Sequence, residues 1–224
     1  MNDLPASIAA LRRRLADPAA GAGVVGRRAV SRGRRAAVLI LFWWDAGVPR
    51  TDGVEGLRLA IVEKSARLRA HPGQLAFPGG GVDAADADDV AAALREADEE
   101  IGVGPDEVDV LGVLPAASVR VSGYRVTPVV GWWRAPRPLR VVDTDEIAAV
   151  HAVGVPDLLD PAHRRTWEHP LGYEGPAFLV EDLFVWGFTG DLLAGLLQVA
   201  GWERPWDAGV RTPIPRRFFR DTGQ

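Results

Sequence analysis

The stretch FPGGGVDAADADDVAAALREADEEIGV, residues 77–103, carries the strongest structural signal in this sequence. Its second part predicts a helix over 88–101, which Asp88 or Asp89 caps at the start and Gly102 ends in the left-handed conformation. Four apolar side chains recur along it at helical spacing: Val90, Leu94, Ala97 and Ile101. This apolar stripe predicts that the helix packs against a sheet.

Three glutamates, Glu96, Glu99 and Glu100, fall on a separate arc of this helix, turned away from the stripe. Like charges at this spacing destabilise a helix by about 0.2–0.5 kcal/mol per pair. A hard cation such as magnesium, bound by these carboxylates, would offset their repulsion, because it prefers carboxylate oxygens and substrate phosphate as ligands. Arg95 lies four residues before Glu99 and can hold its carboxylate. The alternative interpretation is a solvated acidic helix face.

The glycine run before the helix favours a binding site over that alternative. Gly79, Gly80 and Gly81 follow Pro78 and predict a turn with exposed backbone N–H groups. Such a turn lets a substrate approach the backbone closely, just ahead of the carboxylates. We therefore expect the glycines to hold phosphate oxygens while the acids hold metal ions.

Composition narrows the remaining possibilities for this chain of 224 residues. The absence of Cys excludes disulfides and thiolate ligands, and the four His form no local pair, so oxygen would have to hold any metal. The net charge of −4 argues against bulk nucleic-acid binding. The longest apolar run, residues 36–44, is about half of what a bilayer helix requires, and the N-terminus does not read as a secretory signal. We expect a cytoplasmic protein without a membrane segment.

The rest of the chain predicts a mixed α/β sheet domain with helices on its faces. Strands are expected over 36–44 and 57–63, paired as a hairpin, and over 108–114, 124–132 and 148–155. A short hairpin is expected over 178–180 and 183–186. Helices are expected over 5–16, 156–159 and 189–200. The segment from 213 to the end is expected to be loosely held.

The segment READEEIGV, residues 95–103, resembles the second half of the signature of the Nudix hydrolase family at every fixed position. That signature reads Gly, five residues, an acid, about seven residues, and then R-E-apolar-x-E-E-x-G-apolar. In the first half, counting from Gly80 places Asp86 at the acid position with one extra residue following it. Counting from Gly81 places Ala87 there. The role of the first acid is therefore open.

The upstream residues resemble one branch of that family, the coenzyme A pyrophosphatases. Ser65, Arg69 and Gly73 precede Phe77 at four-residue intervals, in the pattern S-x3-R-x3-G-x3-FPGG. Four later segments also look like that branch: 122–132, 145–153, 157–164 and 185–193. The resemblance implies a Nudix fold, with a mixed β-sheet sandwiched between helices (α/β/α). It covers a domain over 35–207, flanked by an N-terminal helix and loop extension over 1–34 and a C-terminal tail over 208–224.

The resemblance implies hydrolysis of the pyrophosphate bond of CoA or acyl-CoA, giving 3′,5′-ADP and 4′-phosphopantetheine or its acyl form. It implies Mg²⁺ or Mn²⁺ as cofactor, held by Glu96, Glu99 and Glu100, with Glu146 as a further acid. Glu99 or Glu100 would accept the proton of the attacking water, and Arg95 would orient the carboxylates. The substrate-binding candidates are Arg67, Arg69, Gly79, Gly80 and Gly81.

Several of these assignments have a structural alternative. Arg69 can brace its loop instead of contacting substrate, Glu146 can be an ordinary loop glutamate, and Ser65 is expected to bond the local backbone. The eight Trp can pack the core instead of stacking on adenine. The N-terminal helix can form a homodimer contact or fold back on the domain. Other substrates such as ADP-ribose or NADH, a nucleotide sensor without catalysis, and an enzyme acting on nucleic acid remain alternatives to CoA hydrolysis.

Overall fold

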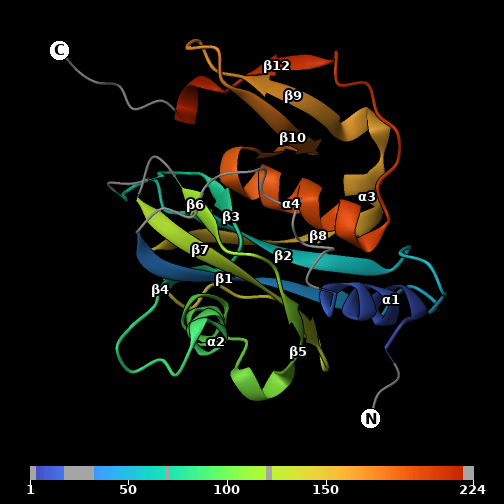
Figure 1. Ribbon diagram of the computed structural model, residues 1–224, viewed down its shortest axis with the longest axis vertical. Helices are drawn as coiled ribbons and strands as arrows, with labels where there is room; N and C mark the ends of the chain where they lie inside the picture. The colour runs from blue at the N-terminus through green and yellow to red at the C-terminus, as the bar shows by residue number, and fades with distance from the viewer. Residues whose placement is uncertain (1–3, 18–32, 69–70, 120–122, 219–224) are drawn as a thin grey trace.

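The computed structural model describes residues 4–17, 33–68, 71–119 and 123–218 (Figure 1). Within these ranges, the chain forms a large mixed sheet, a smaller second sheet and helices in layers around them. This arrangement confirms the predicted α/β class with helices on both faces of a mixed sheet.

The larger sheet has eight strands in the described part of the chain, with β3-β2-β1-β7-β5 as its main order. β4 pairs with β1, β6 with β7, and β8 with β2. The strands are β1 (Arg34–Trp44), β2 (Leu57–Lys64), β3 (Leu75–Ala76), β4 (Gly79–Gly81), β5 (Val108–Val113), β6 (Ala117–Val119), β7 (Tyr124–Trp133) and β8 (Ile147–Gly154). β1 and β7 run parallel, and β1 and β2 form the predicted antiparallel pair, with Phe42 opposite Leu59. The central strands are buried on both faces, as the apolar run over 36–44 predicts.

The helices divide between the two faces of this sheet (Figure 1). The helices are α1 (Ala6–Leu15), α2 (Asp89–Ile101), α3 (Val155–Leu159) and α4 (Gly187–Ala200), and the 3-10 turns are η1 (Pro105–Glu107), η2 (Pro161–His163) and η3 (Arg216–Phe218). α2 covers one face and α4 the other. α1 packs on α4 and β5 and buries Ile8 and Leu11, so the N-terminal helix folds back on the domain. In the described ranges, no helix is both long and apolar enough to cross a membrane.

α2 begins and ends where the sequence predicts. Asp88 accepts a hydrogen bond from the Ala91 N–H at 2.8 Å, and Gly102 adopts the left-handed conformation at φ 69° and ψ 31°. The predicted stripe packs on the sheet, with Ala97 and Ile101 buried and Val90 and Leu94 partly buried. The buried face is wider than predicted, because Ala92 and Ala93 are buried as well. Glu100 lies with this buried face and is 2% exposed, so the prediction that all three glutamates turn away from the sheet is wrong for Glu100.

A second sheet packs beyond α4 (Figure 1). Its order is β11-β10-β9-β12, with β9 (Arg164–Glu168), β10 (Glu174–Val180), β11 (Leu183–Val185) and β12 (Arg211–Pro213). The predicted hairpin corresponds to β10 and β11. β9 and β12 were not predicted. β12 pairs in parallel with β9, and a pairing such as Arg211 with Thr166 joins residues far apart in the sequence. The expectation of a loosely held C-terminal segment is wrong as far as the described residues reach, since Ile214 and Phe218 are buried.

The central tryptophans pack the core. Trp43, Trp44, Trp132 and Trp133 are each 7% exposed or less. Trp43 and Trp133 meet edge to face, with ring centroids 5.7 Å apart. The core interpretation is therefore confirmed for these four side chains.

Removing side-chain volume from the layer between the two sheets should lower the free energy of unfolding. Leu193 on α4 is fully buried, and Leu193→Ala is expected to lower the free energy of unfolding by about 2–5 kcal/mol, because the cavity cannot close completely. Leu171 is 76% exposed, and Leu171→Ala should change it by less than about 0.5 kcal/mol. Urea unfolding of both variants checks the contrast. Equal effects would contradict the described packing.

Candidate functional site

The three glycines lie against the sheet beside α2. They form the short strand β4 rather than the predicted turn, and they pair with β1 through Gly79 opposite Val38 and Gly80 opposite Ala37. A Cβ on Gly79 would stand 2.3 Å from the Ala37 carbonyl oxygen, closer than atoms can approach. A Cβ on Gly80 would stand 2.5 Å from the Glu96 carboxylate. Glycine is therefore needed at Gly79 for close packing against β1, and a side chain at Gly80 would displace the Glu96 carboxylate on α2.

Arg95 is the centre of the acidic cluster. Its Nη1 donates a hydrogen bond to Glu99 Oε2 at 2.8 Å, and its Nη2 donates to the Gly81 carbonyl oxygen at 3.0 Å. The same Nη2 lies 3.0 Å from Glu96 Oε1. The neighbouring carboxylates raise the pKa of Arg95, with Asp86 as the largest contribution. One guanidinium thus joins the helix, the glycine strand and the loop between them.

Asp86 is the acid that the sequence left without a role. Arg95 Nε and Nη2 donate to its two carboxylate oxygens at 3.0 and 3.1 Å, which is a two-point ion pair. The Asp86 side chain is 5% exposed and also accepts a hydrogen bond from the Asp83 N–H at 2.8 Å. The hydrogen bonds from Arg95 and from this N–H lower the pKa of Asp86. The structure thus gives Asp86 a definite partner, Arg95 of the signature helix.

Glu100 is held by a cation and a backbone donor. Its Oε1 lies 2.6 Å from Lys64 Nζ, and its Oε2 accepts a hydrogen bond from the Gly79 N–H at 3.0 Å. The pKa of Glu100 is raised, because the effect of burial outweighs the opposite effect of the Lys64 ammonium. The Gly79 N–H is thus directed to Glu100 and not to open solvent, where we expected it to meet phosphate.

Glu96 and Glu99 differ in their surroundings. The pKa of Glu96 is raised, because the effect of burial outweighs the opposite effect of the Arg95 guanidinium. The Glu99 side chain is 56% exposed, so its carboxylate is accessible from solvent. In the described part of the chain, no three carboxylate or imidazole groups converge as a ready-made metal site. The oxygen donors are those a hard cation prefers, but Arg95 and Lys64 contact them in this conformation.

Glu146 reaches the cluster from the far side of Lys64. Its Oε2 lies 3.8 Å from Lys64 Nζ, and its side chain is 55% exposed. Lys64, the single lysine of the chain, therefore stands between two of the predicted metal ligands, Glu100 and Glu146. Sequence spacing did not predict these contacts, because the three residues belong to β2, α2 and the segment before β8.

The structure describes one of the two predicted substrate-binding arginines. Arg67 is exposed, and its Nη2 donates to the Thr144 carbonyl oxygen at 3.2 Å, next to the Glu146 segment. Arg69 lies outside the described residues. Ser65 is buried and its Oγ accepts a hydrogen bond from the Arg67 N–H at 3.4 Å, which agrees with the local backbone role expected for it.

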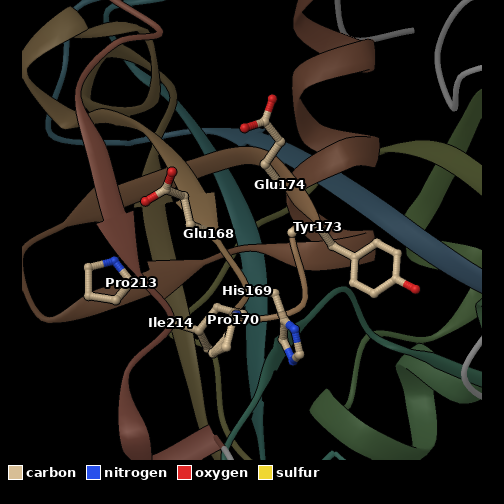
Figure 2. Close-up of a pocket in the computed structure, with 8 residues that line it drawn as sticks. Glu168, His169, Pro170, Tyr173, Glu174, Pro213 and Ile214 are labelled. Atoms are coloured by element: carbon tan, nitrogen blue, oxygen red, sulfur yellow. The ribbon is translucent and has the colours of Figure 1, made fainter.

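A surface hollow of about 410 Å³ lies away from this cluster, at the β9–β10 hairpin and β12 (Figure 2). Glu168, His169 and Tyr173 line it, and none of the residues predicted for the site does. The carboxylate cluster on α2, rather than this hollow, has the charged groups suited to diphosphate chemistry.

Comparison with known proteins relates the cluster to a family. The family described as NUDIX domain matches residues 43–171, more than half of the chain. The uncharacterised Nudix hydrolase NudL of Citrobacter koseri is 43% identical over 150 residues, covering 63% of this chain and 74% of the relative. NudL of Escherichia coli strain K12 is 42% identical with the same coverage. A solved NUDIX hydrolase from Nitrosomonas europaea covers 82% of this chain and 81% of its own, with 11% identity and a TM-score of 0.48.

The glycine strand provides a test of the packing around the cluster. Gly79→Ala is expected to lower the free energy of unfolding by about 1–3 kcal/mol, because its Cβ meets the backbone of β1. Gly81 is the matched control, since a Cβ there meets nothing within 4 Å, and Gly81→Ala should stay within about 0.5 kcal/mol. Denaturant unfolding measures both. Equal losses would show that the strand does not lie against β1 as described.

The Asp86–Arg95 pair should make stability depend on pH. Because Arg95 lowers the pKa of Asp86, the pair's contribution is present above the unfolded-state pKa of about 3.9. It is lost as pH falls through the lower folded-state value. Asp86→Asn should therefore unfold at lower urea than the native chain near neutral pH, with the two midpoints converging in acid.

Asp83→Asn is the control for that series. The Asp83 side chain is 72% exposed and lies 3.9 Å from Arg95, so its variant should keep the native midpoint throughout. A gap between the native chain and Asp86→Asn that stays constant in acid would contradict the assigned ion pair.

Proposed function

This chain belongs to the Nudix family of hydrolases, and we propose that it cleaves the pyrophosphate bond of CoA or acyl-CoA. The products are 3′,5′-ADP and 4′-phosphopantetheine or its acyl form. The observation that carries the hydrolytic assignment is the cluster in which Arg95 holds Asp86, Glu96 and Glu99 beside the glycine strand. The choice of CoA rests on the S-x3-R-x3-G-x3-FPGG pattern from Ser65 to Gly80.

The proposed cofactor is Mg²⁺ or Mn²⁺. Four carboxylates would hold it: Glu96, Glu99, Glu100 and Glu146. When bound, such an ion neutralises diphosphate charge and lowers the pKa of bound water. Glu99, which is exposed and bonded to Arg95 through Oε2, would accept a proton from an attacking water, whereas Lys64 and Gly79 bond both oxygens of Glu100. Arg95 positions the acids rather than contacting substrate.

Arginines before the glycine strand are proposed to bind the CoA phosphates. Arg67 is exposed, and its side chain makes one hydrogen bond to a backbone carbonyl in the described structure, so donors remain for an anion. Arg69 is proposed from its place in the pattern. A guanidinium suits this task because it binds phosphate oxygens at two points.

Product analysis tests the substrate. Purified protein is incubated with CoA, ADP-ribose and NADH in parallel, with Mg²⁺ or Mn²⁺, and the products are separated and identified. We expect CoA to yield 3′,5′-ADP fastest. Faster cleavage of ADP-ribose or NADH would keep the hydrolase and overturn the CoA assignment. Binding of a nucleotide without cleavage would instead support a sensor.

Glu99→Gln tests the carboxylate cluster. The neutral amide is a poor ligand and a poor base, so kcat is expected to fall by about 100-fold or more. Asp98→Asn removes a neighbouring exposed carboxylate on α2 and should leave kcat within about twofold, because such surface changes rarely perturb the fold. Equal rates for the native chain and Glu99→Gln would contradict the assigned role of Glu99.

A further inference from the structure

Arg164 is a buried cation with an unused hydrogen-bond donor. It begins β9 and is 3% exposed. Its guanidinium carbon lies 4.3 Å from the ring centroid of Phe178 and 4.5 Å from that of Trp206. Within the described residues, its Nε has no hydrogen-bond partner. The rings stabilise the charge through their faces, but they accept none of its in-plane N–H groups.

The nearest opposite charge does not satisfy this guanidinium. Glu203 Oε1 lies 3.7 Å from Arg164 Nη1, which is an ion pair but too long for a hydrogen bond. An unpaired donor on a buried charged group costs more free energy than one at the surface. The environment therefore favours an added acceptor with oxygens in the plane of the guanidinium.

Arg164 lines a pocket of about 380 Å³ between the second sheet and α4. Thr166 and Gln198 add polar groups to its wall, and Trp206 adds an indole. Because α4 and α2 cover opposite faces of the main sheet, the pocket is separate from the carboxylate cluster (Figure 1). The hydrolytic site does not use it.

The charges around the pocket limit the ligand. Glu203 and Glu174 line the pocket together with Arg164, and Glu174 is paired with Arg211, so a doubly charged phosphate would be repelled by the Glu203 carboxylate beside the Arg164 guanidinium. A single carboxylate matches the guanidinium edge with two oxygens and carries only one charge. Trp206 offers a surface for a flat apolar body attached to it.

We propose that this pocket binds a small monocarboxylate whose two oxygens accept hydrogen bonds from the Arg164 guanidinium, with its apolar part beside Trp206. The site has no part in the proposed diphosphate hydrolysis. The expected ligand is an organic acid with a flat or compact apolar body.

The test uses the full chain labelled with nitrogen-15 and three probes: benzoate, acetate and inorganic phosphate. Arginine Nε–H and tryptophan indole signals are followed by NMR, with Arg164→Met and Trp206→Phe used to assign them. Benzoate is expected to shift the Arg164 Nε–H and Trp206 indole signals in a saturable manner, and more tightly than acetate. No saturable shift with benzoate would overturn the proposal. Tighter binding of phosphate than benzoate would overturn the monocarboxylate assignment.

Matched variants locate the binding. Arg164→Met keeps an apolar side chain between the rings and should weaken benzoate binding at least about tenfold. Arg165→Met removes the next cation on β9, which points to the other face of the sheet, and should leave the affinity unchanged. Benzoate binding that survives in folded Arg164→Met would overturn the assigned site.

A second variant decides the matter if Arg164→Met does not fold. Glu203→Gln removes the carboxylate that competes for the guanidinium, so benzoate affinity should rise about threefold. An unchanged or weaker affinity would overturn the proposal. CoA hydrolysis is measured in parallel, and it should be unaffected by Glu203→Gln because the pocket lies across the sheet from α2.

Discussion

The contacts of one guanidinium hold the carboxylate cluster together. Arg95 binds Asp86 on the loop before α2, Glu96 and Glu99 on the helix, and the carbonyl oxygen of Gly81 on β4. Without it, the carboxylates on one helix face would repel one another. With it, the repulsion becomes a set of charge-assisted hydrogen bonds that also fixes the helix to the glycine strand. The site is thus built from the same contacts that position α2.

Close packing explains why the glycine strand lies beside this cluster. Gly79 lies so near the backbone of β1 that it has no room for a side chain, and a side chain on Gly80 would displace the Glu96 carboxylate. The approach lets the Gly79 N–H reach Glu100, a carboxylate that is otherwise buried beside the sheet. Lys64 supplies the opposite charge on the other oxygen. A buried carboxylate is tolerated here because both of its oxygens are bonded.

The main sheet separates two chemically different regions. On the α2 side, acids outnumber the cations that pair with them, and the proposed metal site rests on these carboxylates. On the α4 side, Arg164 is buried among aromatic rings, and the Glu203 carboxylate lies 3.7 Å from it. The second sheet and the residues after α4 create this environment. The family signature, which lies on the other side, does not describe it.

The sequence alone determined the long central strands, the helix that carries the signature and the acidic residues on that helix. Local periodicity predicted β1, β2, β7 and α2, because each buries a face whose apolar pattern is visible within a few turns or residues. The caps of α2 at Asp88 and Gly102 were equally local. The signature also named Arg95 and its glutamates, since their spacing on one helix brings them together in any fold that keeps the helix.

Only the tertiary structure decided the contacts between distant elements. It paired Asp86 with Arg95 at two points, placed Lys64 between Glu100 and Glu146, and turned the glycine run into a strand on β1. It also paired β12 with β9, which kept the described C-terminal residues packed. Such contacts depend on which elements become neighbours when the sheets close. The sequence pattern does not predict which elements come into contact, because sequence spacing constrains distances only within a single helix or strand.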